Sequence, residues 1–295
     1  MKRIVVLAIA VSMFMAIVVG SVSASCPSGM VSYWKLDDGS GTTASDYLGA
    51  YDGILKPAGL EPTWTTLGKV NGALSFDGID DYVDCGDITE LNGVSAFTVV
   101  GWYKDNNMGG HNRHFDKGDG WDNDISGATY SNRLYIEVGN GANTYAYWSG
   151  YSTVISSGVW YHAAFVFDGS GAANADKTKI YVNGVERSLT FSGSMPSSTA
   201  DLTGYSFTIS KAVNPWDGDI DEVAIFNRAL SVSEILDLYN KGLAGHGYCW
   251  PPPVGGTWVS IDKFELLAPW ITLVSLVTVA AVSLVYVKHR KKQQH

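Results

Sequence analysis

Apolar and polar side chains alternate with a period of two between residues 30 and 228, which is the pattern of β-strands. Residues 133–138 show it most clearly, and residues 96–103 are β-branched or aromatic almost throughout. Residues 159–167 form a nearly continuous apolar run, typical of a strand buried on both faces. Further strand-like runs lie at residues 82–85, 206–210 and 223–226. Because turn residues separate these runs, the pattern predicts an all-β fold, either a sandwich or a jelly roll.

Two local signals mark the ends of elements. Asn183-Gly184 joins two strand-like runs, and this dipeptide is the strongest short-range signal for a β-hairpin. Ser231 can cap a helix, Glu234 completes a capping box with it, and Gly242 can end the helix. We therefore expect one short C-terminal helix that packs on the sandwich after its last strand.

The N-terminal segment does not fit a sandwich. A basic pair precedes an apolar run over residues 4–19, and small residues follow up to Ala24. Residues 1–24 are therefore predicted to be a secretory signal peptide that is cleaved after Ala24. An uncleaved signal anchor is the alternative. A lipoprotein acylated at Cys26 is a weaker one, because Ser23 stands where a lipobox has a leucine-like residue.

A second long apolar segment, residues 266–287, contains no charged side chain. A helix of this length spans about 33 Å, which matches a bilayer core of about 30 Å. The basic tail at residues 288–295 follows at once and should stay in the cytoplasm by the positive-inside rule. We therefore expect a single-pass cell-membrane protein with a transmembrane helix at 266–287. Its extracellular domain would cover residues 26–245, and a Pro- and Gly-rich linker residues 246–265.

Charge and cysteine content narrow the function classes. The two terminal segments hold six of the 20 Lys and Arg, so the other 14 face 29 Asp and Glu and give the body a net charge of −15. Such a surface repels phosphate backbones and disfavours nucleic-acid binding.

Cys26 and Cys249 bracket the body, and Cys85 falls within a strand-like run. In an oxidising compartment we predict a Cys26–Cys249 disulfide and a buried, free Cys85.

Six motifs resemble, in order, those of laminin-G-like jelly-roll domains of the concanavalin A-like lectin and glucanase fold. They lie at residues 31–41, 72–83, 97–102, 160–162, 180–184 and 218–231. The resemblance covers nearly the whole exported body and implies a two-sheet antiparallel jelly-roll sandwich. Lectins, adhesion modules and domains appended to enzymes share this fold, so the fold does not determine the function.

The resemblance also raises the question of glycoside hydrolysis. Retaining glucanases of this fold carry Glu-x-Asp-x-Glu or Glu-x-Asp-x-x-Glu on one strand, where alternate residues share a face. Residues 219–224 match best, but Asp stands at the nucleophile position, and Val223 or Ala224 stands at the acid/base position. The catalytic pair is absent, so we predict that the protein is not an enzyme. No convincing zinc set emerges either from the predicted polar loop with His111, His114, Asp116 and Asp119.

A structural calcium ion is a further implication of the resemblance. Related jelly rolls hold Ca²⁺ between an early loop and the last strand, which makes Asp46 and Asp221 the candidate side-chain ligands. The early loop departs from the usual Asp-Ser-Gly-Asn-Gly, since Asp46 is followed by Tyr-Leu-Gly-Ala. Ordinary solvated carboxylates are the alternative.

A sugar site needs flat aromatic faces with a few polar partners. Such rings are supplied by Trp121, Tyr145, Tyr147 and Trp148. For the two tryptophans, ligand stacking and local packing both stay open. The sequence thus predicts a membrane-anchored extracellular lectin-like module that binds, without catalysis, a glycan or a surface protein, the partner being an extracellular polysaccharide or a glycoprotein. A structural or adhesive cell-envelope protein without a small-ligand site is the alternative, and a glycoside hydrolase ranks third.

Overall fold

The computed structural model describes residues 26–120 and 122–250. The predicted signal peptide, the transmembrane helix, the basic tail and most of the linker lie outside the described residues, as does Trp121. Among the residues described, no helix is both long and apolar enough to cross a membrane. The described residues belong to one compact unit whose last residue is Trp250.

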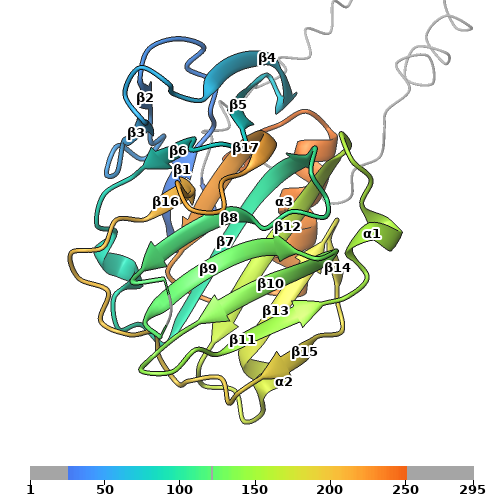
Figure 1. Cartoon of the computed structure of the whole chain (residues 1–295). Helices are drawn as coiled ribbons and strands as arrows, with labels where there is room; N and C mark the ends of the chain where they lie inside the picture. Colours follow the sequence, from blue (N-terminus) through green and yellow to red (C-terminus); the bar gives the residue numbers. More distant parts are fainter. Residues whose placement is uncertain (1–25, 121, 251–295) are drawn as a thin grey trace, which may run out of the picture. The chain divides into compact units, whose positions relative to one another are not determined.

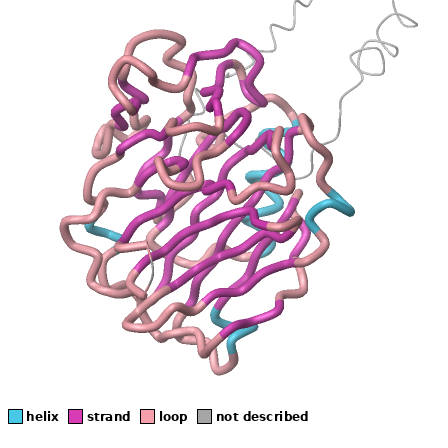
Figure 2. Tube along the Cα trace, viewed as in Figure 1, coloured by secondary structure: helices cyan, strands magenta, loops and turns pink. Residues whose placement is uncertain are grey.

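Two antiparallel sheets form a sandwich (Figures 1 and 2). The eight-stranded sheet has the order β14 (Val185–Glu186), β13 (Thr178–Val182), β12 (Trp160–Asp168), β7 (Ala96–Asp105), β17 (Asp217–Phe226), β5 (Gly72–Asp77), β4 (Thr63–Val70), with β1 (Met30–Trp34) also paired to β17. The nine-stranded sheet has the order β15 (Thr190–Ser192), β11 (Tyr145–Trp148), β10 (Arg133–Val138), β9 (Asp124–Tyr130), β8 (Asn112–Gly118), β16 (Thr208–Ser210), β6 (Tyr82–Asp84), β3 (Gly53–Lys56), β2 (Thr43–Ala44). The all-β sandwich prediction is confirmed.

The main core lies between the two sheets. Alternate side chains of β10, Leu134 and Ile136, are fully buried, as are those of Phe115 on β8 and Phe165 on β12. The last two lie with ring centroids 5.2 Å apart and so join the sheets. In the view of Figure 1, β8 to β11 lie in front of β12 and β13. The other faces of the front strands are therefore free to carry polar side chains.

The helix α3 (Val232–Leu243) forms a third layer on the outer face of the eight-stranded sheet. Ser231 is its N-cap and forms the predicted capping box with Glu234. Ile235 and Leu238 are buried in a second apolar cluster that includes Trp102 of β7. This cluster anchors α3, as the sequence predicts. The shorter helical turns are η1 (Thr89–Leu91), α1 (Tyr151–Val154) and α2 (Asn174–Lys177).

The ends of the described chain are joined by the predicted disulfide. Cys26 and Cys249 are bonded across a sequence separation of 223 residues. Cys85 is buried and free, which confirms the prediction for all three cysteines. Tyr248 is fully buried, so the domain continues to Trp250 beyond the expected boundary at residue 245.

The predicted polar loop at His111–Asp119 is wrong, because β8 runs through it. The pairing of β8 with β9 shifts register between Arg113 and Phe115, so His114 is an additional residue that turns inward. Its Nε2 lies 2.8 Å from Tyr161 Oη inside the core. The shift breaks the alternation of polar and apolar residues, and this hides the strand from a reading of the pattern.

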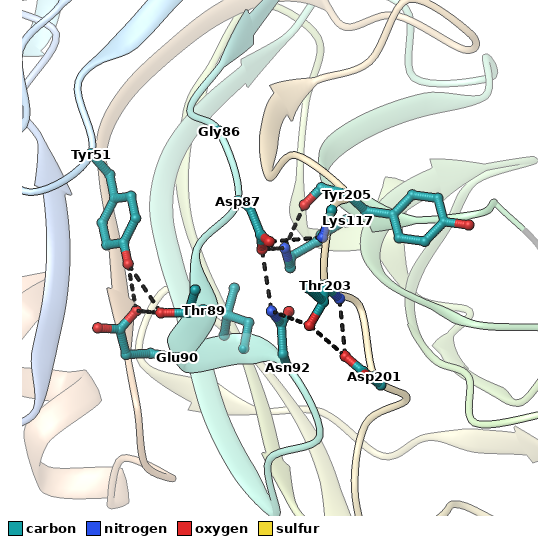
Figure 3. A network of polar contacts seen from close by, with 12 residues as sticks. Tyr51, Gly86, Asp87, Thr89, Glu90, Asn92, Lys117, Asp201, Thr203 and Tyr205 are labelled. Carbon is teal, nitrogen blue, oxygen red and sulfur yellow. Dashed lines mark hydrogen bonds and ion pairs between the residues drawn. The ribbon is translucent and has the colours of Figure 1, made fainter.

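A polar network fastens the loops at one end of the central strands β8, β16 and β6 of the nine-stranded sheet (Figure 3). Lys117 Nζ lies 2.6 Å from Asp87 Oδ1, and the Lys117 side chain is completely buried. The Gly204 amide donates to the other oxygen of Asp87 at 2.7 Å. The hydrogen bond from Lys117 and that from Gly204 lower the pKa of Asp87 to about 2. A buried cation thus holds the chain after β6 and the loop before β16 against β8.

Candidate functional site

The outer face of the nine-stranded sheet contains a pocket of about 310 Å³. Its walls come from β8, β10, the two loops that flank β8, the loop before β11 and the loop after β16. The residues that define its chemistry are His111, Arg113, Asp119, Glu137, Lys211 and Asn214. These side chains offer hydrogen-bond donors and acceptors of both charges within one concave surface.

Cross-strand register explains why these side chains meet. Asp116 of β8 pairs with Ser126 of β9, and Ser126 pairs with Glu137 of β10. Glu137 pairs in turn with Tyr145 of β11, which pairs with Ser192 of β15. Directly paired residues of neighbouring strands point to the same face of a sheet. On this face, one row of side chains therefore runs from Asp116 through Glu137 at the pocket to Tyr145 beside it.

A second row runs parallel to the first. Arg113 pairs with Ala128, and Ala128 pairs with Tyr135. Tyr135 pairs with Tyr147 of β11, which pairs with Thr190. This register places an arginine of the pocket in line with two further tyrosines. The pocket and the aromatic residues thus belong to one continuous surface.

Ion pairs order the floor of the pocket. Arg113 Nη1 lies 2.6 Å from Glu137 Oε2, and the Ser126 hydroxyl donates to the same oxygen at 2.7 Å. Lys211 forms an ion pair with Asp116, and Arg113 Nη1 lies 3.7 Å from the second oxygen of Asp116. These contacts keep the charged groups fixed before any ligand arrives, so binding requires little reordering of the side chains.

Three carboxyl groups below this face, those of Asp124, Asp116 and Glu137, have pKa values that shift in different directions. Burial and the charges of Glu137 and Asp116 together raise the pKa of Asp124 to about 7. Burial also raises the pKa of Asp116, against the opposing charges of Lys211 and Arg113. For Glu137, the effect of burial is outweighed by the charge of Arg113 and the hydrogen bonds from Ser126 and Arg113, which lower its pKa.

Three tyrosines form an aromatic cluster beside the pocket: Tyr135, Tyr145 and Tyr147. All three are half-buried. The ring centroids of Tyr135 and Tyr147 lie 5.2 Å apart, and those of Tyr135 and Tyr145 lie 5.8 Å apart. The Arg133 guanidinium lies 4.5 Å from the centroid of the Tyr147 ring. We call these three residues the tyrosine cluster.

The structure divides the four predicted aromatic ligands. Tyr145 and Tyr147 lie in the tyrosine cluster, on the outer face of β11. Trp148 points to the opposite face, is only 9 % exposed and packs in the core between the sheets. For Trp148, local packing therefore replaces ligand stacking, because adjacent residues of a strand face opposite ways. Trp121 lies outside the described residues.

The two predicted calcium ligands have different surroundings. Asp46 accepts hydrogen bonds from the backbone amides of Tyr33, Leu48, Ala50 and Tyr51 at 2.9–3.1 Å. Its oxygens thus organise the loop between β1 and β3. Asp221 accepts one bond from the Val70 amide at 2.8 Å, and its Oδ1 atom is buried with no hydrogen-bond partner in the described chain. Calcium binding at this pair stays a prediction.

Much of the pocket leaves no clear signal in the sequence. Tyr135 and Glu137 share a face with Arg133 in the alternating run of β10, and that alternation was the available signal. Arg113 was hidden by the bulge in β8. Lys211 follows β16 in a loop, and nothing local in the sequence connects it to Asp116.

A sandwich of two antiparallel sheets is an architecture of lectin domains. The family model described as the concanavalin A-like lectin/glucanases superfamily matches residues 77–236, and the chain belongs to this family. A search of curated proteins gave no match.

Solved structures share the fold at low sequence identity. The binding domain of Paraclostridial mosquitocidal protein 1 has a TM-score of 0.56 and 15% identity, over 72% of this chain and 52% of that one. A Trypanosoma rangeli sialidase in complex with 2,3-difluorosialic acid has a TM-score of 0.51 and 16% identity, over 75% and 34%. Domain 4 of a Geobacillus stearothermophilus extracellular arabinanase, in complex with arabinotriose, has a TM-score of 0.49 and 22% identity, over 70% and 97%. This chain thus spans about half of that binding domain and about a third of the sialidase.

Proposed function

We propose that the protein is a membrane-anchored extracellular lectin-like module that binds a glycan without catalysis. The ligand class is an extracellular polysaccharide or the glycan of a glycoprotein. One observation carries the proposal: a fixed polar pocket and the tyrosine cluster lie side by side on one sheet face. Sugars combine hydroxyl groups with apolar C–H faces, so they are recognised by hydrogen-bonding groups next to flat rings.

Three carboxyl groups of this face, those of Asp116, Asp124 and Glu137, support binding rather than hydrolysis. Hydrolysis of a glycosidic bond uses one carboxyl group as acid and a second as nucleophile or base, and both must reach the substrate. Asp116 and Glu137 each form an ion pair with a basic side chain, and Asp124 is only 2% exposed. The three residues also stand on three neighbouring strands and not on one strand.

The extracellular location rests on the two apolar ends of the sequence. The predicted signal peptide would export residues 26–250, and the predicted span at 266–287 would retain them at the cell membrane. The Cys26–Cys249 disulfide agrees with export, because disulfides persist in oxidising compartments.

A glycan array tests the binding proposal. Purified protein should select particular saccharides, and Tyr135→Ala should weaken that binding by roughly 5- to 150-fold, which corresponds to the loss of an aromatic contact of about 1–3 kcal/mol. Tyr205→Ala is a matched control, because this tyrosine is 43% exposed and lies outside the tyrosine cluster. An array without selective binding would favour the structural or adhesive alternative. Release of free sugar from a bound glycan would favour the hydrolase.

A further inference from the structure

The turn between β5 and β6 brings three carboxyl groups together, those of Asp77, Asp80 and Asp81. One side-chain oxygen from each lies within 4.8 Å of the others. Calcium binds oxygen ligands at about 2.4 Å, so two ligands on opposite sides of the ion stand about 4.8 Å apart. The three side chains are therefore spaced closely enough for a single ion to lie among them.

One of these carboxyl groups is buried and incompletely hydrogen-bonded. Asp81 is only 3% exposed, and its Oδ2 atom accepts a hydrogen bond from the Asp77 amide at 2.9 Å. Its Oδ1 atom is buried and has no hydrogen-bond partner within the described ranges. A buried carboxylate oxygen without a partner is unfavourable, and each such group in a folded protein needs an explanation. A bound cation would supply the missing partner.

The negative charge of this turn is not balanced by nearby cations. Within residues 26–120 and 122–250, none of the three aspartates forms an ion pair. Asp217 pairs in register with Asp77 and adds a fourth carboxyl group. The turn thus gathers repelling charges that a divalent cation would neutralise.

The conformation of the turn is set locally and keeps the carboxyl groups in place. Gly78 has a φ of +75°, which favours glycine, and a side chain at this position would collide with Asp217. The Asp77 carboxylate accepts a hydrogen bond from the Ile79 amide at 2.8 Å. The Asp81 carbonyl accepts one from the Ser210 hydroxyl at 2.9 Å, which ties the turn to β16.

We propose that the β5–β6 turn binds a hard divalent cation, Ca²⁺, through the carboxylates of Asp77, Asp80 and Asp81. Calcium fits better than magnesium, because it accepts six to eight oxygens in irregular geometry, whereas Mg²⁺ demands a near-ideal octahedron. Water would complete the coordination at this partly exposed turn. The site differs from the Asp46 and Asp221 pair, and it does not depend on the glycan proposal.

Calorimetric titration of the full-length protein with CaCl₂, after treatment with chelator, tests the site. We expect one binding event with a Kd of about 10⁻⁴–10⁻³ M, the range of extracellular modules. Asp80→Asn should weaken it at least tenfold, since it removes a ligand charge. This variant should fold, because the Asp80 side chain makes no hydrogen bond in the described part of the chain. Asp122→Asn, at an exposed aspartate of another turn, should bind as the unmodified protein does.

Thermal unfolding with calcium and with chelator gives a second readout. Calcium should raise the melting temperature of the unmodified protein by mass action and should raise that of Asp80→Asn less. In chelator, Asp80→Asn should melt no lower than the unmodified protein, because the substitution relieves repulsion. An absence of heat and of stabilisation with calcium would overturn the proposal. A second result would also overturn the proposal: Asp80→Asn binds calcium as tightly as the unmodified protein does, while Asp221→Asn does not bind it. The ion would then lie at Asp221.

Discussion

Glu222 is the most unusual single residue of the described chain. It lies in β17 with a φ of 53°, in the register shift between Asp221 and Ala224, and its side chain is completely buried. The Tyr33 hydroxyl donates to Glu222 Oε2, while Oε1 is buried without a hydrogen-bond partner among the described residues. Burial raises the pKa of Glu222 to about 8, although the bond from Tyr33 lowers it. The folded protein therefore holds a proton at Glu222 at neutral pH.

This proton makes stability depend on pH. The unfolded chain releases it near an ordinary glutamate pKa of about 4.3, and the folded protein releases it near 8, so stability should fall as pH rises between these values. Glu222→Gln should reduce that fall by on the order of 3 kcal/mol, because Gln stays neutral. Chemical denaturation at pH 5 and pH 8 measures the difference, with Asp122→Asn at an exposed turn as the control. An equal loss of stability in Glu222→Gln and the unmodified protein would contradict the assignment.

At the scale of the element, one face of β11 packs in the core and the other carries two tyrosines of the proposed glycan site. Trp148→Ala should lower the free energy of unfolding by about 3–5 kcal/mol, the usual cost of removing a large buried side chain. Tyr147→Ala should leave the melting temperature nearly unchanged and weaken glycan binding, since its ring lies in the tyrosine cluster. Calorimetric melting and array binding of the two variants check both expectations. If Tyr147→Ala unfolds early and Trp148→Ala does not, the faces of β11 are reversed.

The elements that the sequence predicts well are those determined by neighbours along the chain. The strand Arg133–Val138 follows from its alternation, and the α3 cap follows from Ser231 and Glu234. The strand β8 was missed because its polar side chains are buried by partners on other strands. The Lys117 side chain, for example, is completely buried beside Asp87.

The candidate site shows the same limit. Tyr145 and Tyr147 were predicted from composition, because clustered rings are visible in one segment. Arg113, Glu137 and Lys211 belong to the pocket through cross-strand register and a loop. No period or motif carries that information, since it arises only when distant strands pair.

At the scale of the molecule, the disulfide closes the domain on itself. It encloses nearly all described residues in one loop, and in the chain-entropy model a loop of this length stabilises by on the order of 5 kcal/mol. A protease cut inside the domain would therefore leave its two pieces joined until the bond is reduced. Protease fragments of this protein must therefore be reduced before they are used to determine its membrane topology.

The predicted topology can be tested on intact cells. Added protease should remove residues 26–250 and leave a small membrane fragment with the basic tail, because the signal peptide and the positive tail place the domain outside. Immunoblots against the tail, run with reductant so that disulfide-linked pieces separate, should show only the short fragment. Permeabilised cells are the control, since protease should reach the tail there. Loss of the tail signal in intact cells would reverse the orientation, and a fully protected domain would place it inside the cell. Either result would also remove the extracellular glycan from consideration as ligand.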